Sequence, residues 1–242
     1  MMDLRGRVVL VTGAGRRLGR AIALGLAQAG AHIAVHYHTS AEEAEETVRR
    51  IRALGVDAEA FPADLRDPGQ IPPLVDAVAR RFGRLDGLVS AAAVMRVTRW
   101  HEITPAQWDE ILALNLRAPM FCAQAAARHM EDGVIIHIAD GSALKPWPDY
   151  LAHTVSKAGL VALTRALALA LAPRIRVNVV IPGPILKPVH WEEERWERLI
   201  RRVPLGRAGA PEEVARAVRY LMEADYVTGA VLVIDGGHHL RS

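Results

Sequence analysis

Short apolar segments alternate with longer amphipathic segments along the whole chain, and this alternation restricts the fold more than any other feature. Seven segments are short, nearly continuous apolar runs typical of buried strands: residues 7–12, 32–37, 58–63, 85–90, 134–139, 176–181 and 231–234. Helical periodicity occupies the intervals near residues 18–30, 41–54, 69–83, 105–130, 150–172 and 211–223. Strands that alternate with helices form a parallel sheet with helices on both faces. The sequence therefore predicts an α/β fold, a doubly wound parallel sheet in three layers.

Length and hydrophobic content suit one domain. With 242 residues, of which 51% are hydrophobic, the chain can bury a single large core. Because no repeat or linker divides it, we expect one domain over residues 1–242. Residues 183–204 depart from the pattern, since they are rich in proline and include Trp191 and Trp196. A long excursion of this kind is typical of a loop that covers a substrate. A short surface helix whose tryptophans pack on the body is the alternative, and one segment can be both.

Composition disfavours several other classes of protein. The net charge is only +3 and the arginines are scattered rather than gathered in a stripe, so we expect no nucleic-acid partner. The start lacks a signal-peptide pattern, no apolar run has the length of about 20 residues that spans a membrane, and Cys122 is the only cysteine. We therefore expect a cytoplasmic protein without a membrane partner. The histidines lack metal-ligand spacing, so we expect no metal site.

A glycine-rich turn joins the first predicted strand to the first predicted helix. Gly13, Gly15 and Gly19 allow a tight turn and let a pyrophosphate approach the backbone. The start of the following helix adds free N–H groups and a favourable dipole. We expect these glycines, together with Arg16, Arg17 and Leu18 in the same turn, to bind a dinucleotide.

The end of the second predicted strand indicates which dinucleotide binds. A site for NAD carries Asp or Glu about 20 residues beyond the glycines, to bind the ribose 2′-hydroxyl. This chain has no acid there before Glu42; it has instead His36, Tyr37, His38, Thr39 and Ser40. A 2′-phosphate would meet Arg16 or Arg17, His38 and the hydroxyls through charge-assisted hydrogen bonds. We therefore expect NADP(H), although a solvated turn is the alternative for the two arginines.

Motifs over nearly the whole chain resemble those of the short-chain dehydrogenase/reductase family. They are the glycine loop, Ala63-Asp64-Leu65, Leu114-Asn115-Leu116, Ser156-Lys157-Ala158, the turn Ile181-Pro182-Gly183-Pro184, and Asp235-Gly236-Gly237. Within the family, residues 15–20 and 36–41 are most similar to pteridine reductases. The resemblance implies a Rossmann fold in which Asp64 and Leu65 contact the adenine. It implies that the rest of the cofactor lies against Ala91, Lys157, Pro182, Gly183 and Ile185.

The active-site positions depart from the family pattern. The usual catalytic serine position holds Asp140, a change that also resembles pteridine reductases. The family's Tyr-x-x-x-Lys reads His153 to Lys157, and its Asn-Asn-Ala-Gly reads Ser90 to Ala93. Pteridine reductases carry an aromatic ring shortly after strand four that stacks on the pterin, whereas the matching residue here is Met95. The resemblance therefore implies a catalytic set of Asn115, Asp140, His153 and Lys157.

The altered set has a chemical interpretation. His153 and Lys157 are four residues apart on one predicted helix, so both side chains point to the same face. Histidine is the commonest general acid, and a carboxylate such as Asp140 can orient it. A weakened remnant of an active site would present the same pattern. Tyr150 is the other nearby phenol, and we expect it to line the pocket or to pack rather than to react.

Two functions remain open. The first is an NADPH-dependent oxidoreductase that reduces a carbonyl or C=N group of a small molecule, such as a pterin or a ketone, by hydride transfer. The second is a catalytically silent NADP-binding protein that acts in sensing or assembly. The family resemblance also implies a homotetramer, paired through the helices near 105–130 and 150–172 and through the last strand.

Overall fold

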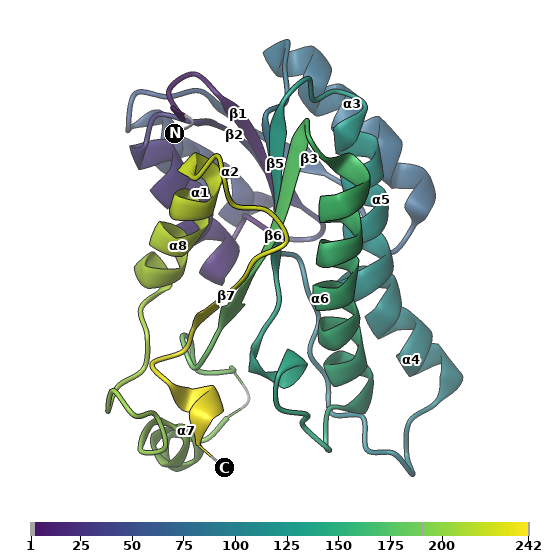
Figure 1. The fold of residues 1–242 in the computed structure, drawn as a ribbon, viewed down its shortest axis with the longest axis vertical. Helices are drawn as coiled ribbons and strands as arrows, with labels where there is room; N and C mark the ends of the chain where they lie inside the picture. Colours follow the sequence, from purple (N-terminus) through teal and green to yellow (C-terminus); the bar gives the residue numbers. More distant parts are fainter. Residues whose placement is uncertain (1–2, 190, 242) are drawn as a thin grey trace.

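All seven predicted strands form one parallel sheet in the computed structural model, which describes residues 3–189 and 191–241 (Figure 1). The strand order is β3-β2-β1-β4-β5-β6-β7. The bounds are β1 (Val8–Thr12), β2 (His32–Tyr37), β3 (Ala58–Pro62), β4 (Gly87–Ser90), β5 (Gly133–Ile138), β6 (Ile175–Pro182) and β7 (Val231–Ile234). The order reverses between β1 and β4, and ligands of such sheets bind at the carboxyl ends of the strands beside this point.

Helices cover both faces of the sheet, which confirms the predicted three layers (Figure 1). One face carries α1 (Arg17–Gln28), α2 (Ala41–Arg52) and α8 (Pro211–Glu223); the other carries α3 (Ile71–Phe82), α4 (Pro105–Leu112), α5 (Ala118–Ala127) and α6 (Leu151–Leu171). Side chains alternate between the two cores along each strand. In β1, Val9 and Val11 pack with α1 and α8, whereas Val8 and Leu10 pack with α3 and α5.

The helix predicted near residues 105–130 is interrupted. A π-helical turn, η2 (Ala113–Arg117), separates α4 from α5, and α5 ends at Ala127. Such turns frequently occur at functional sites because the extra residue redirects a side chain. Here η2 carries Asn115, which is only 1% exposed. The helical stretch predicted near residues 105–130 is present, and only its π-helical turn was not predicted, because apolar positions recur at helical spacing on both sides of the turn.

The segment of residues 183–189 and 191–204, hereafter the covering segment, lies at the carboxyl end of the sheet (Figure 1). It contains one short helix, α7 (Glu193–Ile200), within otherwise irregular chain. The segment therefore contains both the long loop and the short surface helix that the sequence offered as alternatives.

The sequence was expected to contain no apolar run long enough to span a membrane, but helix α6 is one such run. Its 21 residues, with a mean hydropathy of 1.4 in an 18-residue window, are long and apolar enough to cross a membrane by length and composition alone. The helix packs on β6, however, and it buries Lys157 and Thr164 within the domain. Helices in the core of an α/β fold pass the same test, so α6 is accounted for by the fold.

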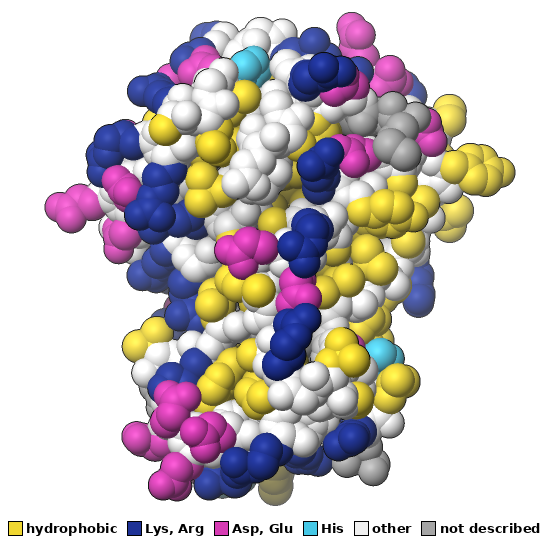
Figure 2. All heavy atoms as spheres, turned by 90° about the vertical axis from the view of Figure 1, so that its left-hand side faces the viewer, with side chains coloured by type: hydrophobic (Ala, Val, Ile, Leu, Met, Phe, Trp, Pro, Cys, Tyr) yellow, Lys and Arg dark blue, Asp and Glu magenta, His cyan; other side chains and the backbone are white. Residues whose placement is uncertain are grey.

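Charges of both signs are mixed with hydrophobic side chains on the face shown in Figure 2. Dark blue and magenta side chains lie next to one another over this face (Figure 2). This face therefore carries no uninterrupted basic stripe.

Candidate active site

The glycine turn brings three segments of backbone too close together for larger residues. A Cβ atom on Gly13 would lie 2.9 Å from Cα of Ala92, and one on Gly19 would collide with the carbonyl oxygen of Gly13. A Cβ on Gly15 would lie 2.9 Å from Oγ of Ser40. Helix α1 begins directly after this turn without a side-chain cap. Its first N–H groups are therefore available to an anion, so the turn fits a pyrophosphate.

His36 lies beneath the glycine turn and supports it. Its Nδ1 accepts a hydrogen bond of 3.1 Å from the N–H of Gly13, and its Nε2 donates to the carbonyl of Ala63 at 3.1 Å. Burial lowers the pKa of His36 to about 4, which keeps the ring neutral as this pattern requires. The structure therefore does not bring His36 to the expected cofactor surface. Its neighbour Tyr37 is half-buried and packs against the core.

The end of β2 presents a basic and hydroxyl-bearing surface. His38, Thr39 and Arg16 are exposed, and Ser40 directly precedes α2. The Nε2 atom of His38 lies 3.8 Å from a carboxylate oxygen of Asp64. The exposed side chains of Arg16 and His38 can thus donate hydrogen bonds to a phosphate at this end.

Arg17 points elsewhere. Its Nη2 donates a 3.0 Å hydrogen bond to the carbonyl oxygen of Lys187, 170 residues along the chain, in the covering segment. The expectation that Arg17 serves a phosphate at the end of β2 therefore does not match its position. The side chain lines the cavity described below instead.

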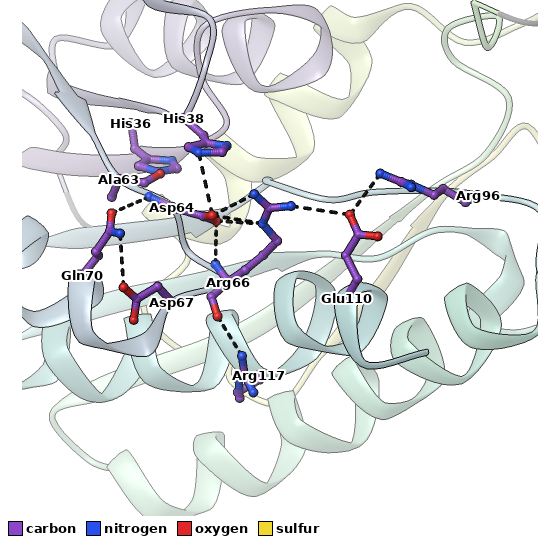
Figure 3. A network of polar contacts seen from close by, with 10 residues as sticks. All are labelled: His36, His38, Ala63, Asp64, Arg66, Asp67, Gln70, Arg96, Glu110 and Arg117. Carbon is purple, nitrogen blue, oxygen red and sulfur yellow. Dashed lines mark hydrogen bonds and ion pairs between the residues drawn. The ribbon is translucent and has the colours of Figure 1, made fainter. Parts of the chain in front are cut away.

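Asp64 belongs to a network of ion pairs (Figure 3). Both oxygens of Asp64 accept hydrogen bonds from Arg66, which lowers the pKa of Asp64 to about 2. Arg66 also forms an ion pair with Glu110 at 3.5 Å, and Glu110 pairs with Arg96 at 3.0 Å. The adjacent Leu65 is 3% exposed and packs in the core, so only its backbone remains for an adenine.

A cavity of about 510 Å³ opens at the carboxyl ends of the strands. Its lining brings together residues that the sequence predicted from distant segments: Arg17, Leu18, Ala91, Asp140, His153, Lys157, Pro182, Gly183 and Ile185. The covering segment supplies one wall, including Trp191 and Trp196.

His153 and Asp140 form a close pair in the cavity wall. The distance between Nε2 of His153 and Oδ2 of Asp140 is 2.6 Å. The side chain of His153 is 2% exposed and that of Asp140 is 23% exposed, so the carboxylate faces the cavity. Burial acts to raise the pKa of Asp140, but the hydrogen bond and charge of His153, with help from Lys157 and Ser142, lower it to about 2. The carboxyl group is therefore ionised, and Nε2 must carry the shared proton.

Asn115 fixes the opposite side of the imidazole. Its amide nitrogen lies 2.9 Å from the carbonyl oxygen of Val94, 3.1 Å from Oγ of Ser156 and 3.3 Å from Nδ1 of His153. Nδ1 of His153 lies 3.1 Å from the same Val94 carbonyl. Nδ1 donates to this carbonyl when it carries a proton and accepts from the Asn115 amide at 3.3 Å when it does not. Asn115 and the Val94 carbonyl thus contact Nδ1 of the imidazole, while Asp140 contacts Nε2.

Lys157 lies one turn further along α6. Its Nζ donates to the carbonyl of Ile138 at 2.9 Å, and the residue is 3% exposed. Burial lowers the pKa of Lys157, while the negative charge of Asp140 acts in the opposite direction. The ammonium group thus has hydrogen-bonding capacity left for a ligand in the cavity.

Several residues near the site were not predicted. The ring of Trp147 stacks on that of His153, with centroids 6.1 Å apart and planes 12° apart. Thr12 accepts hydrogen bonds from the N–H groups of Ala91 and Ala92, and Arg20 donates to the carbonyl of Gly15. A lone tryptophan in a loop that follows Asp140 was the one available signal. The hydroxyl and guanidinium contacts are tertiary, and sequence spacing does not reveal them.

Tyr150 lines the same cavity, in agreement with the expectation that it lines or packs. It is 5% exposed, and its hydroxyl has no hydrogen-bond partner among the described residues. Among these same residues, no cluster of three or more His, Cys, Asp or Glu side chains is placed to hold a metal.

The parallel sheet, the glycine turn and the lysine on α6 beside the cavity define the chain as a short-chain dehydrogenase/reductase. Residues 13–239 match the model of a family described as enoyl-(acyl carrier protein) reductase, and the chain belongs to this family of oxidoreductases. It is 34% identical to the 3-oxoacyl-[acyl-carrier-protein] reductase FabG of Staphylococcus aureus, over 96% of this chain and 97% of that protein. It is 36% identical to the L-rhamnose 1-dehydrogenase (NAD(P)(+)) of a Sphingomonas species, over 100% and 99%.

Solved structures agree with this assignment. The FolM alternative dihydrofolate reductase 1 from Brucella canis, complexed with NADP, superposes with a TM-score of 0.94 at 36% identity, covering 99% of this chain and 96% of that one. A short chain dehydrogenase from Burkholderia cenocepacia, also in complex with NADP, gives a TM-score of 0.92 at 36% identity, covering 98% and 99%. The predicted fold class and enzyme class are therefore confirmed.

Proposed function

We propose that this chain is an NADPH-dependent reductase of a C=N or carbonyl group in a small molecule, and that a C=N group is the preferred substrate. The observation that carries this proposal is the pair of Asp140 and His153 in the cavity wall, with the carboxylate on the cavity side. A pterin is one substrate of this kind. The FolM relatives support this choice, because their names describe dihydrofolate reductases.

The cofactor is NADP(H). The glycine turn and the uncapped start of α1 suit its pyrophosphate, and Arg16, His38 and Ser40 suit its 2′-phosphate. The backbone beside Asp64 and Leu65 suits the adenine. Lys157 suits the nicotinamide ribose, while Ala91, Pro182, Gly183 and Ile185 suit the nicotinamide end. Two of the solved relatives described above are complexes with NADP.

NADPH supplies a hydride to the substrate carbon, and the protein supplies the proton. In this proposal, His153 takes the place of the family's tyrosine. The proton leaves Nε2 of His153 and reaches the substrate nitrogen through the carboxylate of Asp140, which ends the step ionised as it began. Asn115 and Val94 hold the imidazole in position throughout. Trp147 stacks on the imidazole ring.

The charge at the cavity wall favours C=N over C=O. Hydride addition to a carbonyl creates an alkoxide, and an adjacent carboxylate would destabilise that negative charge. A protonated C=N group carries a positive charge before hydride addition, and the same carboxylate would stabilise it. His153 and Lys157 are 2% and 3% exposed, whereas the side chain of Asp140 is 23% exposed. We infer that the carboxylate of Asp140, the most exposed of these three side chains, meets the substrate.

A catalytically silent NADP-binding protein is the second candidate. One observation favours it: both ring nitrogens of His153 are bound to groups of the protein. NADPH oxidation measured with a panel of cyclic imines, dihydropterins, quinones and ketones separates the two candidates. The proposal expects turnover that is fastest with the C=N compounds. Tight NADPH binding without turnover on any member of the panel would support the silent protein.

We also propose the domain organisation, the oligomeric state and the cellular location of the enzyme. We infer one functional domain over residues 1–242, in which the covering segment closes over the substrate. The enzyme is a cytoplasmic homotetramer without nucleic-acid or membrane partners. Exposed apolar side chains on α5 and α6, including Phe121, Val155 and Leu169, support pairing through these helices.

A further inference from the structure

Arg17 has an unusual backbone conformation. It is the one non-glycine residue in the described part of the chain with a positive φ, at 52°. This region is unfavourable for a residue with a Cβ atom and free of that cost for glycine. A strained conformation that persists in a turn of this kind indicates that the side chain serves a function.

The side chain of Arg17 reaches across the mouth of the cavity. Its hydrogen bond to the carbonyl of Lys187 joins the glycine turn to the covering segment. The side chain of Lys187 pairs in turn with Glu193 at 2.5 Å, at the start of α7. The guanidinium of Arg195, also on α7, stacks over the ring of Trp191 at 3.9 Å. The carbonyl group that accepts from Arg17 therefore belongs to a segment whose own side chains contact one another.

From these contacts we infer that Arg17 is a positioning residue that fastens the covering segment over the substrate cavity. This inference rests on the proposed cofactor and substrate sites, and it separates Arg17 from the residues that select NADP. Because Arg17 lies in the turn that suits the pyrophosphate, a bound cofactor would order the turn and strengthen the closure.

The substitution Arg17→Gly tests the inference, because it removes the guanidinium and the strain together. The folded protein should gain about 2–4 °C in Tm, the shift expected from relief of modest strain in a domain of this size. Trypsin should nevertheless cleave the covering segment several-fold faster, at sites identified by mass spectrometry. The KM for the imine substrate should rise about tenfold, as expected for one lost charged hydrogen bond. The ratio of NADPH to NADH affinity should stay within twofold of the wild type.

Two further variants complete the design. Arg17→Lys keeps a cationic donor and the unfavourable φ, so it should restore part of the protection from trypsin without the gain in Tm. Arg16→Gly, at the exposed neighbouring arginine, should reduce NADPH affinity and leave the protection of the covering segment unchanged. Tm and proteolysis need no turnover, so they test the closure even if the proposed reaction is wrong.

The opposite results would overturn the inference. If Arg17→Gly leaves the rate of cleavage unchanged, Arg17 does not fasten the segment. If it also reduces the affinity for NADPH but not for NADH, Arg17 is a ligand of the 2′-phosphate.

Discussion

His153 and Asp140 lie 2.6 Å apart, and their contact engages the imidazole nitrogen on the side of the cavity wall. The proposed mechanism therefore passes the proton from His153 through the carboxylate of Asp140 to the substrate. In the proposed mechanism, Asp140 is the group that contacts the substrate and His153 is the source of the proton.

Asp140→Asn should lower kcat for a cyclic imine by about 10²–10³, because an amide neither relays the proton nor stabilises a cationic substrate. The loss should be smaller for any ketone that is reduced, since the repulsion of the alkoxide is also removed. Steady-state NADPH oxidation measures both. Asp76→Asn is a matched control, because Asp76 pairs with His129 at 2.7 Å on the outer surface. Equal losses for imine and ketone would contradict the proposed preference.

The end of β2 should determine the choice of cofactor. Arg16→Ala and His38→Ala should each weaken NADPH binding, the former by about 10–100-fold, which is the usual value of a charged hydrogen bond. NADH binding should change little, because NADH lacks the 2′-phosphate. Calorimetry with both cofactors measures this. Equal affinity of the wild type for NADPH and NADH would refute the assignment.

Stability should depend on pH through His36. Its pKa falls from 6.5 to about 4 on folding, so the unfolded chain binds more protons between these values. The free energy of unfolding should therefore fall by on the order of 3 kcal/mol as the pH drops from 6.5 to 4. Urea unfolding of wild type and His36→Gln should show this component only in the wild type. His101→Gln, at an exposed histidine, should keep the wild-type dependence, and identical profiles for His36→Gln and wild type would exclude the role of His36.

The quaternary structure can be tested at α5. Light scattering at micromolar concentration should give a homotetramer for the wild type. Phe121→Arg should give a smaller species, because it places a charge on an apolar surface of α5 that is 38% exposed in the single chain. A monomeric wild type would contradict the proposed assembly.

The sequence predicted the sheet well because its strands are buried on both faces and therefore read as unbroken apolar runs. It predicted the glycine turn for a similar reason, since a Cβ atom at Gly13 or Gly19 has no room. It did not predict the π-helical turn at Asn115, because a one-residue insertion leaves apolar spacing intact on either side.

The sequence also did not predict the direction in which two of the candidate site side chains point. His36 and Arg17 both occur in motifs that suit a cofactor, yet His36 is buried under the turn and Arg17 turns toward Lys187. Which way such a side chain points depends on partners 23 to 170 residues away, so local spacing does not determine it.

Turnover of His153→Ala with NADPH and a cyclic imine tests the central claim most directly. The proposed mechanism predicts that kcat falls by about 10²–10⁴, the usual contribution of a general acid, while NADPH affinity is retained. His153→Tyr, which restores the residue typical of the family, should keep or increase the wild-type activity. Wild-type turnover that survives His153→Ala unchanged would contradict the account and would direct attention to Tyr150 or a water molecule as the proton donor.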